Sequence, residues 1–138
     1  MTVRLNPYIG FREDAREAMT FYQSVLGGDL SISTYADLHA SEDPAEQEKV
    51  MHAMLETPDG LVLMAADTPN RMEFQPQAGV SVSLSGDDET KLRGWWERLS
   101  EGGNVVMPFE KAPWGDTFGM CVDRFSTSWM VNAAGQPS

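Results

Sequence analysis

The feature that most constrains this chain is an internal repeat of one helical pattern. In each copy, bulky apolar residues are spaced i, i+3, i+4 and i+7, which is the stripe of an amphipathic helix with one buried face. A glycine pair ends each run, at residues 27–28 and 102–103. The stripe consists of Ala18, Phe21, Tyr22 and Val25 in the first copy, and of Leu92, Trp95, Trp96 and Leu99 in the second.

Strand-forming segments surround each predicted helix in the same order. The order is strand, helix, strand, strand, strand, and it occurs twice. The first copy comprises a strand at 3–11, a helix at 13–28, a strand at 29–35 and a hairpin at 49–67. The second comprises a strand at 79–86, a helix at 87–103, a strand at 104–107 and a hairpin at 118–133.

A repeated βαβββ unit predicts an α+β fold. One such unit leaves one face of its sheet uncovered, so two units are expected to pair. We expect a single domain, residues 1–138, built of two modules at about 3–68 and 78–134. Together they form a cupped, mostly antiparallel sheet with the helices outside. The hollow of such a cup is where a small-molecule site forms.

Short signals fix several predicted boundaries. Pro7 lies near the start of the first strand, as an edge strand tolerates. Asp14 and Glu17 predict a capping box, and Gly27 predicts a left-handed stop. Pro58-Asp59-Gly60 predicts the hairpin turn. Trp114-Gly115-Asp116 predicts a turn that delivers the chain into the last hairpin.

Composition excludes some partners. The net charge is −11 with only 10 Lys and Arg, whereas nucleic acid and anionic membrane surfaces require a basic patch. No apolar run is long enough to cross a bilayer, and the start of the chain lacks a secretory signal, so we expect a cytoplasmic location. The lone Cys121 lies in an apolar run and is interpreted as a buried hydrophobic residue.

The chain resembles the vicinal oxygen chelate superfamily, which includes glyoxalase I, bleomycin-resistance proteins and extradiol dioxygenases. Within it, the chain is similar to the PhnB-like branch, often labelled 3-demethylubiquinone methyltransferase-like. The resemblance covers almost the whole chain and rests on the segments NPYIGF, AMTFYQSVLGGDL, VMHAML, VVMPFEKAPWGDTFG and DRFSTSW. It implies the duplicated βαβββ fold and a homodimer, and it does not fix an activity.

The resemblance also implies where a metal would bind. Enzymes of this superfamily hold a divalent ion in the cup through His, Gln or Glu side chains. The matching positions here are about Asn6 to Tyr8, Met64, about Gly79 to Ser81, and Met130. None of them is His or Glu, and thioethers are poor ligands for hard or borderline cations. We therefore expect no metal and no other cofactor, although a divalent metal stays an alternative.

His52 is the candidate catalytic residue, because histidine side chains in general exchange protons near neutral pH. The alternative is a half-buried histidine that bonds to its sheet neighbours. No G-x-S-x-G motif or glycine-rich cofactor loop is present, so neither a catalytic triad nor a methyltransferase site is supported. The candidate ligand-binding residues are Tyr8, Met64, Trp114, Asp116, Phe118 and Met130.

Three functions stay open. The first is a metal-free protein of this superfamily that binds a small organic molecule as a homodimer. The second is a metal-dependent lyase, isomerase or dioxygenase with ligands at other positions. The third is a non-catalytic scaffold that works through protein contacts. Whether the chain is an enzyme is left undecided by the sequence.

Overall fold

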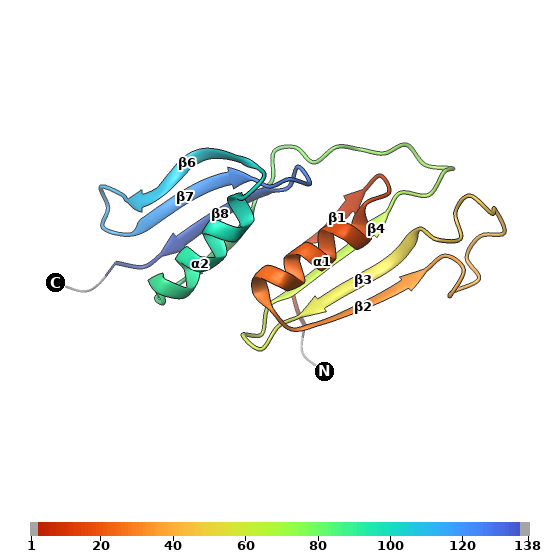
Figure 1. The fold of residues 1–138 in the computed structure, drawn as a ribbon, viewed down its shortest axis with the longest axis horizontal. Coiled ribbons are helices and arrows are strands. Elements are labelled where there is room, and N and C mark those ends of the chain that lie inside the picture. The colour runs from red at the N-terminus through yellow and green to blue at the C-terminus, as the bar shows by residue number, and fades with distance from the viewer. Residues whose placement is uncertain (1–2, 136–138) are drawn as a thin grey trace. The chain divides into compact units, whose positions relative to one another are not determined.

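The structure, a computed structural model, describes residues 3–135 and divides into two compact units, Met1–Gln77 and Ala78–Ser138. Each unit contains one helix lying across one four-stranded sheet (Figure 1). Unit 1 consists of β1 (Tyr8–Phe11), α1 (Ala15–Leu26), β2 (Asp29–Thr34), β3 (Val50–Glu56) and β4 (Val62–Asp67). Unit 2 consists of β5 (Val82–Gly86), α2 (Glu89–Ser100), β6 (Asn104–Lys111), β7 (Thr117–Val122) and β8 (Ser128–Ala133).

The two sheets have the same topology. Their strand orders are β1-β4-β3-β2 and β5-β8-β7-β6. In both, the first and last strands of the unit pair in parallel, and the other pairs are antiparallel. This confirms the α+β class and the duplicated βαβββ order, with each sheet mixed. That the two sheets form one cup stays a prediction.

The repeat extends to single residues at the glycine pairs. A Cβ on Gly28 would lie 2.2 Å from the backbone oxygen of Glu56, and a Cβ on Gly103 would lie 2.2 Å from that of Val122. Glu56 and Val122 hold the same place at the ends of β3 and β7. Glycine is needed at both positions because the chain passes directly against the neighbouring strand there.

The hairpin turns also repeat. Gly60 N–H donates to the carbonyl of Thr57 over 3.0 Å, and Ser126 N–H donates to that of Asp123 over the same distance. Both donors have positive φ, 84° for Gly60 and 70° for Ser126. The predicted turn at Pro58-Asp59-Gly60 is therefore confirmed. Unit 2 places a serine where unit 1 uses glycine.

The helices begin differently. The capping box predicted at Asp14 and Glu17 is wrong: the Asp14 side chain forms no cap hydrogen bond. Instead the buried Asp67 accepts the backbone N–H of Ala15 over 2.9 Å and that of Val50 over 2.8 Å. Burial raises the pKa of the Asp67 carboxyl above its ordinary value.

In unit 2 the helix is capped locally. Asp88 Oδ1 accepts the backbone N–H of Lys91 over 3.1 Å, as an N-cap aspartate does. Glu89, in the first turn, accepts the hydroxyl of the buried Thr117 over 2.9 Å. The start of α2 is thus fixed by its own residues together with one bond to β7.

Three strands differ from the sequence prediction by three or more residues. One is β5, which was expected at 79–86 and begins at Val82. The first strand was expected at 3–11, but β1 begins at Tyr8, and Pro7 supplies only its carbonyl, to Met64 N–H over 3.1 Å. The strand expected at 104–107 continues to Lys111 through Pro108. It tolerates the proline because it is an edge strand with two register shifts.

The core of each unit lies between the helix and one face of the sheet. The core side chains of unit 1 include Ile9, Phe11, Ala18, Met19, Tyr22, Ala53, Leu55 and Ala65. The core side chains of unit 2 include Leu84, Leu92, Trp96, Leu99, Cys121, Trp129 and Val131. Burial raises the pKa of the Cys121 thiol to about 11, so it is an inert core residue as predicted.

Aromatic residues of unit 2 alternate between the two sides of their strand or helix. Trp129 is 1% exposed and lies on the core side of β8, whereas the next residue, Met130, is half-buried on the opposite side. Trp96 is buried in the core. Its neighbour Trp95 is half-buried and receives the ammonium of Lys91 over its ring at 5.6 Å. Only one ring of the predicted Trp95-Trp96 core pair is therefore fully buried.

Candidate functional site

Each sheet has a second face, turned away from its helix, which we call the open face. Side chains alternate along a strand, so the residues between the core residues project from this face. In unit 1 the register places Tyr8 beside Met64, and Met64 beside Met54. His52 projects from the same side of β3, two residues from Met54. The structure thus brings together the predicted Tyr8, His52 and Met64.

Tyr8 and His52 are in direct contact on the open face of unit 1. The hydroxyl of Tyr8 lies 3.4 Å from Nδ1 of His52, and the two ring centroids are 5.9 Å apart. Tyr8 is 55% exposed and His52 is half-buried, so both polar groups can reach a bound molecule. A tyrosine hydroxyl can donate and accept hydrogen bonds, and a neutral imidazole has one nitrogen of each kind.

Met64 has a polar neighbour as well. Asn6 Nδ2 donates to the Sδ of Met64 over 2.8 Å. Asn6 lies in the segment 6–8 where the family resemblance placed a metal ligand. The Asn6 side chain thus contacts Met64, another of the positions matched to metal ligands, through a hydrogen bond to the thioether sulfur.

The open face of unit 2 has the same layout with different chemistry. Met130 is paired with Met120 on one side and with Ser83 on the other. Met64 and Met54 hold the matching places in unit 1, so the methionine pair is part of the repeat. Ser83 takes the place of Tyr8, and Phe118 takes the place of His52, two residues from Met120. The opening position of unit 2, expected at about Gly79 to Ser81, is thus occupied by Ser83.

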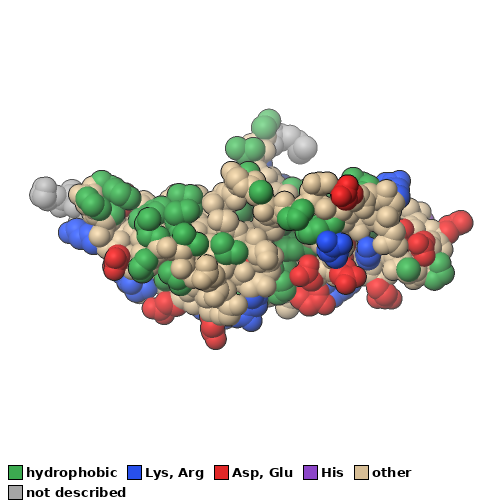
Figure 2. All heavy atoms as spheres, turned by 90° about the horizontal axis from the view of Figure 1, so that it is seen from above, with side chains coloured by type: hydrophobic (Ala, Val, Ile, Leu, Met, Phe, Trp, Pro, Cys, Tyr) green, Lys and Arg blue, Asp and Glu red, His purple; other side chains and the backbone are tan. Residues whose placement is uncertain are grey.

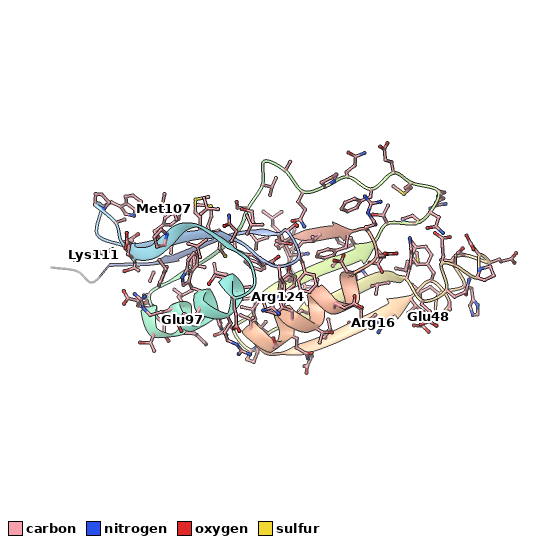
Figure 3. All side chains as sticks on the ribbon, turned by 45° about the horizontal axis from the view of Figure 1, so that its top comes forward. Arg16, Glu48, Glu97, Met107, Lys111 and Arg124 are labelled. Atoms are coloured by element: carbon pink, nitrogen blue, oxygen red, sulfur yellow. The ribbon has the colours of Figure 1, made fainter. Side chains whose placement is uncertain are left out.

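Trp114 and Phe118 meet at one end of the unit 2 sheet. Their ring centroids are 5.9 Å apart, and Trp114 is 64% exposed. Val105, Val106 and Met107 on the edge strand β6 are exposed too. Figure 2 shows hydrophobic side chains gathered over unit 2 on the face in view, and Figure 3 shows Met107 on the side of β6 turned away from α2.

Both carboxylate oxygens of Asp116 accept hydrogen bonds from within unit 2. Its Oδ1 accepts the backbone N–H of Gly135 over 2.8 Å, and its Oδ2 accepts Asn132 Nδ2 over 3.1 Å. The hydrogen bond from Gly135, followed by that from Asn132, lowers the pKa of the Asp116 carboxyl below its ordinary value. This pattern favours the sequence interpretation of Asp116 as a turn residue that accepts backbone hydrogen bonds.

The residues around Met64 and Met130 do not fit a divalent cation. Their strand neighbours on the open faces are Tyr8, Met54, Ser83 and Met120, which offer two hydroxyls and two further thioethers. Zinc, magnesium, manganese and ferrous iron prefer imidazole, carboxylate or thiolate ligands. Within residues 3–135, no three His, Cys, Asp or Glu side chains are grouped so that they could hold an ion.

The sequence reasoning missed several open-face residues. Met54, Met120, Ser83 and Asn132 are not among the candidate ligand-binding residues predicted from the sequence. Their signal was present in the alternation of each strand and in the internal repeat. Aligning the two copies on Met64 and Met130 pairs Met54 with Met120, and alternation along the last strand adds Asn132, but only the sheet register identifies Ser83.

A membrane-spanning segment is not found in the described part of the chain, where no helix is both long and apolar enough to cross a bilayer. The helices α1 and α2 are 12 residues each. They cover their own sheets and have polar outer faces.

Three known proteins are similar to this chain over nearly its full length. A protein of Pseudomonas aeruginosa, PA1353, is 34% identical, with a TM-score of 0.83 and coverage of 98% of this chain and 100% of the other. The PhnB protein of Bacillus cereus is 25% identical, with a TM-score of 0.73 and coverage of 96% and 100%. Protein YjdN of Escherichia coli K12 is 24% identical and covers 96% of each chain.

The family comparison agrees with the fold. The sequence profile of the Glyoxalase/Bleomycin resistance protein/Dioxygenase superfamily matches residues 4–131, which includes both βαβββ copies. The predicted resemblance is thereby confirmed, with PhnB-like proteins among the structural neighbours. This chain belongs to the Glyoxalase/Bleomycin resistance protein/Dioxygenase superfamily.

Proposed function

We propose that this protein binds a small organic molecule on the open face of unit 1, without a divalent metal. The observation that carries the proposal is the contact between Tyr8 and His52 beside the methionines Met54 and Met64. Polar groups that converge next to an apolar surface are the usual composition of a small-molecule site. The open face of unit 2, with Met120, Met130 and Phe118, is proposed separately as a second apolar binding surface.

The methionines suit a ligand with substantial apolar surface. Methionine side chains are unbranched and polarisable, so they adapt to differently shaped apolar groups. Both Met54 and Met64 are half-buried, which leaves part of each side chain available for contact. The expected ligand therefore combines an apolar body with at least one hydrogen-bonding group, which Tyr8 and His52 orient.

A metal-free site is part of the proposal because the hydroxyls and thioethers around Met64 and Met130 are poor ligands for a divalent cation. Calorimetric titration with Mn²⁺, Ni²⁺, Zn²⁺ and Fe²⁺ is the direct test, and no tight site is expected. One tight, stoichiometric site per chain would overturn the proposal in favour of a metal-dependent lyase, isomerase or dioxygenase. His52→Ala should then remove both the metal and any turnover.

The ligand site itself is tested with protein labelled at the methionine methyl groups. In a screen of small organic molecules, a ligand of the proposed site shifts the methyl signals of Met54 and Met64, while Met19, buried in the core, serves as the control. His52→Phe and Tyr8→Phe should each weaken such a ligand. A screen without any ligand for the open face would favour the scaffold function instead.

We also propose a homodimer, as the resemblance implies. The exposed Val105, Val106, Met107 and Trp114 of unit 2 are the surface that we expect to contribute. Light scattering after size-exclusion chromatography measures the oligomeric state. Trp114→Ala should weaken the dimer if this surface forms the interface. A monomer at high concentration contradicts the proposal. The cytoplasmic location stays a prediction.

A further inference from the structure

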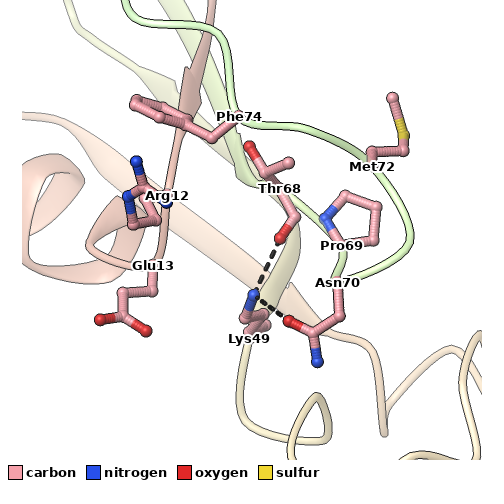
Figure 4. Close-up of a pocket in the computed structure, with 8 residues that line it drawn as sticks. All are labelled: Arg12, Glu13, Lys49, Thr68, Pro69, Asn70, Met72 and Phe74. Carbon is pink, nitrogen blue, oxygen red and sulfur yellow. Dashed lines mark hydrogen bonds between the residues drawn. The ribbon is translucent and has the colours of Figure 1, made fainter.

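A separate cavity lies at one edge of the unit 1 sheet, where three strand ends meet. β1 and β4 run parallel, so both end at this edge, and β3 is antiparallel to β4, so it begins there. Arg12 directly follows β1, Lys49 directly precedes β3, and Thr68 directly follows β4. The cavity has a volume of about 270 Å³ and is closed on the other side by residues 69–74 (Figure 4).

Two cations line this cavity. The ammonium of Lys49 donates to the carbonyl of Thr68 and to Oδ1 of Asn70, each over 2.9 Å. An ammonium has three N–H donors, so one is left for a ligand, and neither acceptor neutralises the charge. Figure 4 shows these two bonds and the Arg12 side chain beside Phe74.

Arg12 is held by an aromatic ring. Its guanidinium carbon lies 4.7 Å from the centroid of Phe74, as in a cation–π contact. Within residues 3–135 the guanidinium is not engaged by a carboxylate ion pair, so its planar set of N–H donors is available. Such a fork matches the two oxygens of a carboxylate.

The remaining lining sets the size and charge of a ligand. Among the lining residues, Arg12 and Lys49 are cations and Glu13 is the carboxylate, and the carboxylates of Glu46 and Asp67, outside the lining, also act on Lys49. A singly charged anion is therefore favoured over a doubly charged phosphate. Pro69 and Met72 add apolar surface near Phe74, which suits a ligand with an apolar body.

We propose that this cavity binds a small organic monocarboxylate, with its carboxylate between Arg12 and Lys49 and its apolar part against Met72 and Phe74. The site is distinct from the open face of unit 1 and does not depend on the function proposed there. On a chain with net charge −11, the fold places two cations, Arg12 and Lys49, at one cavity, which sequence composition does not reveal.

The test is a titration of ¹⁵N-labelled full-length protein with sodium benzoate, followed by amide chemical shifts at constant ionic strength. Saturable shifts are expected at residues 12, 13, 49, 68 and 70–74, with little change at Tyr8, His52 and Met64. Benzyl alcohol, the uncharged analogue, should bind much more weakly. Sodium phosphate should bind more weakly than benzoate.

Variants identify the cations. Arg12→Gln and Lys49→Gln should each weaken benzoate by on the order of tenfold, because each removes a charge-assisted hydrogen bond. Arg98→Gln, on the exposed outer side of α2, removes the same charge elsewhere and should leave the affinity unchanged. Thermal unfolding of each variant controls for folding; if Lys49→Gln disturbs the 69–74 segment, Arg12→Gln still tests the site.

Four outcomes would overturn the proposal. They are the absence of saturable shifts in the wild type, shifts confined to the open face, equal weakening by Arg98→Gln, and phosphate binding as tightly as benzoate. The first three remove the cavity site, and the fourth replaces the monocarboxylate with phosphate. The second outcome would instead favour the ligand proposed for the open face, and the other three leave that proposal unaffected because its test is separate.

Discussion

Unit 1 and unit 2 share one backbone design but carry different chemistry at matching positions. Where unit 1 has His52 beside Tyr8, unit 2 has Phe118 and Ser83. After the first strand, unit 1 has the cation Arg12 and unit 2 has the anion Asp87. The polar open-face pair and the cationic cavity thus both belong to unit 1, while unit 2 offers exposed apolar side chains.

The comparison teaches which residues the fold itself requires. The glycines before β2 and β6, the turns after β3 and β7, and the methionine pairs recur in both units. These positions are constrained by close backbone approach or by their place on the sheet. The open-face and cavity residues that differ are exposed or half-buried, where substitution costs little stability and changes what the surface can bind.

The largest expected effect tests whether the two units depend equally on their glycines. Gly28→Ala and Gly103→Ala should each lower the free energy of unfolding by about 3 kcal/mol, because the new Cβ would overlap a backbone oxygen. Urea denaturation measures it. The matched control is Gly94→Ala in α2, where a Cβ meets open space and about 0.5–1 kcal/mol of stabilisation is expected. A loss below 1 kcal/mol at either glycine would mean that the strand does not approach so closely.

The next effect concerns how each helix is started. Asp67→Ala leaves the backbone N–H groups of Ala15 and Val50 without their acceptor and should cost about 2 kcal/mol. Asp88→Ala removes one exposed cap bond and should cost about 1 kcal/mol. The measurement is again denaturant unfolding. Equal costs, or a larger cost for Asp88→Ala, would contradict the difference between the two helix starts.

A smaller effect is expected at the turns that differ by one residue. Ser126→Gly should stabilise the protein by up to about 1 kcal/mol, because a side chain at positive φ is strained. Gly60→Ser places the same strain in the unit 1 turn and should destabilise the protein by a similar amount. Thermal unfolding of each variant, and of the double variant that carries both substitutions, measures the change in stability. A destabilised Ser126→Gly would show that the serine side chain offsets the strain.

The smallest effect is on how stability depends on pH. One carboxyl in unit 1, Asp67, and one in unit 2, Asp116, should change the free energy of unfolding with pH in opposite directions. Burial raises the pKa of Asp67 above 3.8, so its contribution to stability is present below that pH and is lost as the pH rises through the folded pKa. The pKa of Asp116 is lowered, so its contribution is present above 3.8 and is lost as the pH falls through the folded pKa.

Asparagine variants of Asp67 and Asp116 separate the two contributions, because asparagine does not titrate. Between pH 3 and pH 7, the stability of Asp67→Asn relative to wild type should rise with pH, and that of Asp116→Asn should fall. Unfolding by denaturant at a series of pH values gives both curves. Slopes of the same sign would refute the assignment of burial as the dominant cause at Asp67.

Local patterns predicted the elements well and their ends less well. The apolar spacing around Tyr22 and Trp96 located both helices, and the Pro58-Asp59-Gly60 signal located a turn. Pro108 was interpreted as the end of a strand, yet β6 continues past it because an edge position and register shifts remove the need for its missing N–H. Asp14 has the right residue type for a cap, but Asp67, 53 residues later, supplies the hydrogen bond instead.

The sequence alone determined the duplicated βαβββ order, the α+β class and the core stripes, because these depend on periodicity and on glycine at fixed places. Only the tertiary structure decided that Tyr8 contacts His52 and that Arg12 and Lys49 share a cavity. Those residues lie far apart along the chain. Strand order and register bring them together, and neither follows from the properties of the individual segments.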